Sequence, residues 1–205
     1  MPLRSVPAMT NLRESIVHES LRLFSLQGYL STSITDILHA TDASKGGFYN
    51  HFKSKEELFF EVLHEAQRIW RERVFFELDK IKSPSQRIER LLVNYRDRYL
   101  KDIDDFPGGC VFTMLSVELD DQLPALCQAV NKGFVGLKRL LKGMLDDAVE
   151  QGELDTHLDT TALTELLFAS MIGTSVSYGV DKSAKTLDGS IDALIAFLDS
   201  IRAGD

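Results

Sequence analysis

The sequence contains little cysteine and no long apolar run, and these shortages exclude several classes of protein. Two cysteines in 205 residues, Cys110 and Cys127, are too few for a disulfide scaffold or a cysteine-only zinc site. No run approaches the roughly 18 apolar residues of a membrane span, and there is no signal-peptide pattern. We therefore expect a cytoplasmic protein without a membrane partner.

The five histidines are scattered, and none has the spacing of a metal ligand. His157-Leu158-Asp159 is too small a group for a metal site. We also find no set of nucleophile, base and acid. The expectation is therefore a protein that is not an enzyme, with no catalytic residue, metal or cofactor.

The net charge of −8 argues at first against a nucleic-acid partner. However, residues 1–56 contain six Lys or Arg and five Asp or Glu and carry +1, so the remainder carries −9. DNA would repel the acidic body but not the first part of the chain. The distribution of charge is therefore compatible with DNA binding by an amino-terminal head.

Helix signals follow one another closely in this head. Residues 13–27 have apolar side chains at helical spacing, and Gly28 follows as a stop. Thr32 or Ser33 can then cap a short helix that ends near Ala40, with Asp36 in its first turn. Residues 41–43 form a tight turn, and Asp42 tolerates the left-handed conformation that such a turn requires.

Ser44 caps a second short helix, predicted over residues 45–52. Phe48 and Phe52 are four residues apart and form its inward face, which leaves the polar ends of residues 49–51 turned outward. Gly46 and Gly47 in its first turn are poor helix formers, each costing about 1 kcal/mol relative to Ala. Close approach of the backbone to a phosphate or a base edge would explain them, whereas a plain helical bundle with a glycine corner is the alternative.

Ser54 and Glu57 form a capping box at the start of a long helix. The amide groups at this helix start, flanked by Lys53 and Lys55, are a candidate clamp for a phosphate.

Residues 11–70 resemble the amino-terminal domain of the TetR family of transcriptional regulators. The matching residues are Phe24, Gly28, Tyr29, Ser33, Ile34, Ile37, Ser44, Lys45, Gly46, Phe48, Tyr49, His51, Phe52, Lys55, Leu58 and Phe59. The resemblance implies an all-α protein with a three-helix DNA-binding head (residues 10–70, helix-turn-helix about 34–53). It also implies a helical effector-binding and dimerisation body (71–205). The helix signals along the whole chain predict about nine helices and no strand.

Two positions depart from the pattern of the family. Asp42 stands where the family usually has Gly, and Gly47 stands where it usually has Thr, Ser or Ala. Since Gly47 lacks a side chain that often touches DNA, we expect base contacts to fall more on Lys45 and Asn50.

The helix-turn-helix predicts a set of residues that face DNA. These are Ser33, Ser44, Lys45, Gly46, Gly47, Tyr49, Asn50, His51 and Lys55. Lys45 is the best candidate for reading guanine, because a cation can meet both major-groove acceptors of that base. Tyr49, His51 and Lys55 are expected to bind mainly phosphates, with Ser33 adding one more such contact.

Two very apolar helices are predicted near the end of the chain, over residues 160–178 and 187–201, separated by 179–185. A helix that is apolar around most of its circumference needs burial on more than one side. Members of the resembled family usually dimerise through this pair, so we expect a homodimer that reads a palindromic operator in double-stranded DNA. An ordinary core position is the alternative for any single residue.

A ligand pocket is predicted in the body from aromatic and soft apolar residues. They are Tyr95, Tyr99, Cys110, Phe112, Met114, Phe134 and Met171. The segment from Phe106 through Cys110 to Glu118 resembles a subgroup in which a Gly-Cys pair begins the sixth helix near the effector cavity. Taken singly, each of these residues is more often an ordinary core residue.

The sequence thus predicts a ligand-responsive transcriptional repressor, released from its operator by an unidentified small molecule. A helical small-molecule-binding or enzymatic protein with a vestigial head is one alternative. A regulator that senses oxidants or electrophiles through Cys110 is another, since a helix amino terminus stabilises a thiolate. An activator within the same DNA-binding class also stays open.

Overall fold

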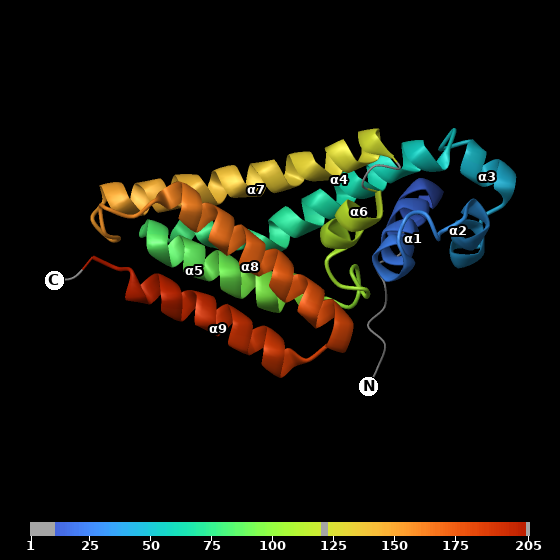
Figure 1. Ribbon diagram of the computed structural model, residues 1–205. Coiled ribbons are helices and arrows are strands. Elements are labelled where there is room, and N and C mark those ends of the chain that lie inside the picture. Colours follow the sequence, from blue (N-terminus) through green and yellow to red (C-terminus); the bar gives the residue numbers. More distant parts are fainter. Residues whose placement is uncertain (1–10, 120–122, 204–205) are drawn as a thin grey trace.

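The computed structural model describes residues 11–119 and 123–203 (Figure 1). Within these residues the chain forms nine α-helices, two short helical segments of other types and no strand, with one isolated bridge between Leu154 and Arg202. The all-α prediction is confirmed. No helix in the described ranges is both long enough and apolar enough to cross a membrane.

The first helices form a head at one end of an elongated molecule (Figure 1). They are α1 (Leu12–Gln27), α2 (Ile34–Thr41), α3 (Lys45–Tyr49) and the first turns of α4 (Lys55–Val74). The later turns of α4 extend from the head into the body (Figure 1). One rigid helix therefore belongs to both parts of the molecule.

Serine hydroxyls cap the starts of α2, α3 and α4, as predicted. The side chains of Ser33, Ser44 and Ser54 each accept a hydrogen bond from the amide three residues later, at 3.0–3.1 Å. Because the side chain satisfies an amide that has no partner inside the helix, the cap fixes where the helix starts. At the end of α2, Asp42 has the expected left-handed conformation, with φ 52°.

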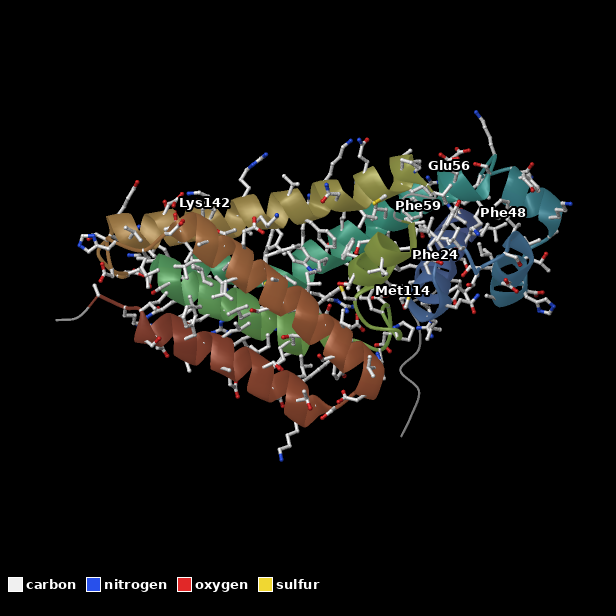
Figure 2. All side chains as sticks on the ribbon, viewed as in Figure 1. Phe24, Phe48, Glu56, Phe59, Met114 and Lys142 are labelled. Atoms are coloured by element: carbon white, nitrogen blue, oxygen red, sulfur yellow. The ribbon has the colours of Figure 1, made fainter. Side chains whose placement is uncertain are left out.

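An aromatic core holds the head together. Phe24 of α1, Phe48 of α3 and Phe59 of α4 are fully buried and lie within the head (Figure 2). The ring of Tyr29 packs edge-on against those of Phe24 and Phe59, with centroids 5.4 and 5.2 Å apart. Phe52 is buried beside Phe48, so the predicted inward face of the second short helix is confirmed.

The body consists of the remaining helices. They are η1 (Leu78–Lys80), α5 (Pro84–Asn94), η2 (Tyr95–Leu100), α6 (Val111–Leu119), α7 (Pro124–Glu150), α8 (Thr160–Asp181) and α9 (Ala184–Ser200). The long helix α7 runs beside α4, and α8 and α9 lie together along the other side (Figure 1). The short helix α6 lies between head and body.

Two local predictions were wrong, and one feature was not predicted. The second short helix ends at Tyr49 rather than Phe52, although turn hydrogen bonds continue to Phe52. The separation predicted over residues 179–185 shrinks to Lys182 and Ser183, because Gly179 stays helical and the Ser183 hydroxyl caps α9. The unpredicted feature is the π-helix η2, into which the helix that begins at Pro84 widens; no local residue pattern indicates it.

Candidate DNA-binding surface and effector cavity

The helix α3 presents an exposed polar surface at the end of the molecule farthest from α9 (Figure 1). Lys45, Gly46, Tyr49 and Asn50 are exposed, and 46% of Tyr49 is open to solvent. Lys45 forms no ion pair with any residue in the described ranges. An exposed, unpaired cation at the start of a short helix can approach a base edge or a phosphate without first breaking an internal contact.

The two glycines of α3 have different surroundings. A Cβ at Gly46 would meet nothing closer than the Ser44 hydroxyl at 3.9 Å, so its missing side chain leaves open surface. A Cβ at Gly47 would lie 3.2 Å from Cδ2 of Leu12 and 3.3 Å from Oγ of Ser44. Packing against α1 is therefore a reason for Gly47 that is independent of DNA.

Ser33 and His51 are less available than the exposed residues of α3. The Ser33 hydroxyl donates a hydrogen bond to a carboxylate oxygen of Asp36 at 2.7 Å and accepts one from the backbone N–H of Asp36. The hydrogen bonds that the Asp36 carboxylate accepts from the Ser33 hydroxyl and from the Ser33 backbone N–H lower the pKa of Asp36, so a negative charge lies beside the expected phosphate contact. His51 is half-buried next to Phe52.

Lys55 turns toward the protein rather than outward. Its ammonium lies 4.1 Å above the ring of Tyr29, in a cation–π contact. Partial burial lowers the pKa of Lys55, and the charge of Glu118 opposes that shift. A phosphate contact by this side chain, as predicted from the sequence, would require it to leave the Tyr29 ring.

Glu118 at the end of α6 holds the turn between α1 and α2. Its carboxylate accepts the backbone N–H groups of Tyr29 at 2.7 Å and Leu30 at 2.8 Å. Gly28 makes room for it: a Cβ there would lie 2.4 Å from a Glu118 oxygen. Gly28 also has φ 84° and ψ 171°, a backbone conformation that is almost restricted to glycine. The contact of Glu118 with this turn could not be predicted from the sequence pattern, because 89 residues separate Glu118 from Tyr29.

A second connection joins the head to the loop of residues 101–109. Nε2 of His18 lies 3.1 Å from Asp105, and Arg73 of α4 pairs with Asp105 as well. The hydrogen bond to Asp105 raises the pKa of His18, and the same bond lowers the pKa of Asp105. The loop also approaches α1 so closely that a Cβ at Gly108 would overlap the carbonyl oxygen of Ser25.

The body contains an apolar cavity of about 320 Å³ lined by residues of α4, η2, α6, α7 and α8. Five of the seven residues predicted for a ligand pocket line it, namely Tyr95, Cys110, Phe112, Phe134 and Met171. The volume lies near the lower end of the range of about 300–1,000 Å³ for small-molecule sites. Cavity and predicted residues thus coincide, and ligand binding there stays a prediction.

The other two predicted residues lie elsewhere. Tyr99 is fully buried, and its hydroxyl donates to Sγ of Cys110 at 3.4 Å. Met114 lines a second, more open cavity between the head and the body, which also includes Glu118 and Gly28. Cys110 borders both cavities.

Sequence reasoning missed the contribution of α4 to the cavity and, apart from Phe134, that of α7. Trp70 and Phe75 pack edge to face at one wall, with ring centroids 5.3 Å apart. Gln67, Arg71 and Lys132 supply its polar part. Trp70 was recognisable as one of the apolar positions of α4, but nothing in the sequence placed α7 opposite it.

The outer surface of α8 carries an exposed stripe of apolar and small residues. They are Ala162, Leu166, Ala169, Gly173, Val176 and Val180, three or four residues apart. Leu166 and Val176 are 46% and 49% exposed, and Val180 is 84% exposed. On α9 a parallel stripe consists of small residues, namely Gly189, Ala193, Ala196 and Ser200. Exposed apolar stripes of this length are typical of surfaces that are covered by another protein.

Both parts of the chain match known protein families. Residues 16–62 match the family described as "Bacterial regulatory proteins, tetR family". Residues 84–194, more than half of the chain, match the "Tetracyclin repressor-like, C-terminal domain".

Individual relatives match over most of their length. The HTH-type transcriptional repressor DhaR of Mycobacterium sp. (strain GP1) is 26% identical over 181 residues, covering 88% of this chain and 89% of that protein. A TetR transcriptional regulator from Chloroflexus aurantiacus J-10-FL has a crystal structure that superposes with a TM-score of 0.86 at 28% identity, covering 94% of this chain and 97% of that one. A TetR-family regulator from Cytophaga hutchinsonii shares the fold with a TM-score of 0.82 at 18% identity. The superposition covers 98% of this chain and 100% of that protein chain.

Proposed function

This chain belongs to the TetR family of bacterial regulatory proteins, and we propose that it represses transcription by holding a palindromic operator as a homodimer until a small molecule releases it. That it is a DNA-binding transcriptional regulator follows from the family. Repression, the operator contacts, the dimer interface and the effector cavity are the proposal. The observation that carries it is the exposed Lys45 on α3, which has no ion partner among residues 11–119 and 123–203 and lies at the end of the molecule opposite the body.

Operator recognition is assigned to α3 and the turn before it. Lys45 reads guanine, and the exposed Asn50 supplies an amide that can pair with the edge of adenine. Ser44, Gly46 and Tyr49 border these two residues and face the backbone of the duplex. The ammonium group of Lys55 is held on the Tyr29 ring. Its contribution to phosphate binding therefore comes from the backbone N–H group at the start of α4 rather than from the side chain.

The dimer is assigned to the exposed stripes of α8 and α9. Small residues such as Ala169, Gly173 and Ala193 allow two helices to approach closely, and Leu166 and Val176 supply apolar area to be buried. Pairing each stripe with its copy across a two-fold axis forms a four-helix interface. Two heads are then presented on the same side of the assembly, as a palindromic site requires.

Release by an effector is assigned to the cavity. A ligand there contacts α4 through Trp70 and α6 through Phe112, and each helix leads to the head. The ligand can weaken DNA binding only by the amount by which it prefers the arrangement of heads that does not fit the operator.

The direct test of DNA binding is a mobility-shift titration with the DNA that flanks the gene. Lys45→Ala is expected to weaken binding by about 1–3 kcal/mol relative to the wild type. Lys82→Ala, an exposed lysine between η1 and α5 that lies outside the head and outside both stripes, is the control and should leave the affinity unchanged. Equal affinities of the Lys45→Ala protein and the control would refute the role of Lys45.

The dimer is tested separately by light scattering on the purified chain. Leu166→Arg places a charge in the α8 stripe and is expected to yield monomers, whereas Gln86→Arg on the exposed side of α5 should leave a dimer. Monomers of the wild type at the concentrations used for DNA binding would overturn the two-fold arrangement. So would an unchanged dimer of the Leu166→Arg protein.

A further inference from the structure

The charged residues that line the effector cavity are all of one sign. Arg71 in the last turn of α4 and Lys132 on α7 contribute the charge, and none of the described lining residues is Asp or Glu. Neither cation forms an ion pair with a side chain in residues 11–119 or 123–203. Both side chains are exposed, so their charges can meet an anion that enters the cavity from solvent, although residues 57–205 as a whole carry −9.

The remaining surface of the cavity is apolar and largely aromatic. Trp70, Phe75, Phe112 and Phe134 contribute rings, and Leu140 adds aliphatic surface. The one phenol on the wall, that of Tyr95, is already used, because its hydroxyl donates to the Met171 carbonyl at 3.2 Å. Polar recognition of a ligand therefore falls to Gln67, Arg71 and Lys132.

This inference rests on the proposed function and specifies the effector. We propose that the effector is an aromatic anion, with a flat apolar body that packs against Trp70 and Phe134 and a single carboxylate-like group that pairs with Arg71 and Lys132. A neutral molecule of the same shape gains the apolar contacts only. A cation of the same shape meets two like charges and no acid among the described lining residues.

The two cations lie on different helices and would contact a bound anion from two sides. Arg71 and Trp70 are neighbours on α4, whereas Lys132 is on α7, whose residues Phe134 and Leu140 line the same cavity. An anion held by both cations would therefore bridge α4 and α7. Because α4 continues into the head, such a bridge acts on the helix that carries the operator-binding unit.

The test uses three probes with one shape and different charge: biphenyl-4-carboxylate, biphenyl-4-methanol and biphenyl-4-methylamine. Binding to the full-length protein is measured by calorimetry and by the fluorescence of Trp70, the single tryptophan of the chain. The carboxylate is expected to bind about tenfold more tightly than the alcohol, and the ammonium ion more weakly than both.

Two variants locate the effect. Arg71→Gln and Lys132→Gln should each weaken binding of the carboxylate by about three- to tenfold and leave binding of the alcohol unchanged. Arg139→Gln, an exposed arginine of α7 that does not line this cavity, is the matched control and should change neither. Because the two substitutions lie on different helices, poor folding of one variant leaves the other as a test.

The outcomes separate this inference from the proposed function. Equal binding of carboxylate and alcohol, persistence of the difference in both variants, or binding of none of the probes would overturn the assignment of an aromatic anion. Release of operator DNA is measured independently by the mobility shift. Charge-dependent binding without release would support the ligand class and count against the proposed release mechanism. Release of the operator by a neutral or cationic molecule would support the release mechanism and count against the ligand class.

Discussion

The carboxylate of Glu118 provides the sharpest test of how the head is attached to the body. Glu118→Ala removes two charge-assisted hydrogen bonds, to the N–H groups of Tyr29 and Leu30 at 2.7 and 2.8 Å. Hydrogen bonds to charged groups contribute about 1.5–3 kcal/mol each, but the exposed N–H of Leu30 can bind water instead. We therefore expect the free energy of unfolding to fall by about 2–3 kcal/mol.

Urea denaturation at a fixed protein concentration measures this change, since a dimer is more stable at higher concentration. Hydrogen exchange resolves it locally, because the amides of Tyr29 and Leu30 should lose protection first. Glu118→Gln keeps one acceptor and should give an intermediate loss, whereas Glu150→Ala at the exposed end of α7 should stay within about 0.5 kcal/mol of the wild type.

Gly28 completes the test as a double-mutant cycle. In the wild-type background Gly28→Ala imposes an unfavourable backbone conformation, about 1–3 kcal/mol, and also displaces the Glu118 carboxylate from its two donors. In the Glu118→Ala background only the backbone effect remains. The double mutant should therefore be more stable than the sum of the single effects predicts, by roughly 2–3 kcal/mol. Simple additivity, with unchanged exchange at Tyr29 and Leu30, would refute the reasoning.

Three further predictions concern single contacts. The buried amide of Asn94 donates to two carbonyls near the end of α4 at 3.1 and 2.8 Å, so Asn94→Ala should lower the free energy of unfolding in urea by about 1–3 kcal/mol. The pKa of His18 is raised, chiefly by its hydrogen bond to Asp105 and further by the charges of Asp105 and Glu19. Its contribution to stability is therefore complete below the ordinary pKa of 6.5 and is lost as the pH rises through the raised value, so His18→Gln should remove that loss from a stability–pH curve. Asp42 has φ 52°, and Asp42→Gly should raise the thermal midpoint, by an amount equivalent to about 0.5–1 kcal/mol; an unchanged or lower midpoint would contradict this.

The parts of the structure that the sequence predicted well are those that depend on near neighbours. The caps at Ser33, Ser44 and Ser54 act on an amide three residues away, and the side chain and the amide are visible in the same short stretch of sequence. The burial of Phe48 and Phe52 follows from their spacing in the same way. These local rules, with the family resemblance, were sufficient for the head and for the all-α class.

The parts that could not be predicted depend on contacts between distant segments. The π-helix η2 places the rings of Tyr95 and Tyr99 in a stack, with centroids 5.6 Å apart, inside a core that other helices supply. The wall of the cavity formed by Arg71 and Lys132 exists only because α7 lies against α4. No periodicity within either helix specifies that neighbour.

The connections between cavity and head explain why a short helix such as α6 matters for the proposed release. Cys110, immediately before α6, and Phe112 line the cavity, whereas Glu118 near the other end holds the turn between α1 and α2. A ligand that displaces the first turn of α6 would therefore pull on the head through Glu118, in parallel with any shift of α4. The two routes predict different behaviour for the Glu118→Ala variant. If α6 transmits the signal, this variant should bind ligand normally yet require more of it to release DNA, whereas transmission through α4 alone would leave the ligand concentration for release unchanged.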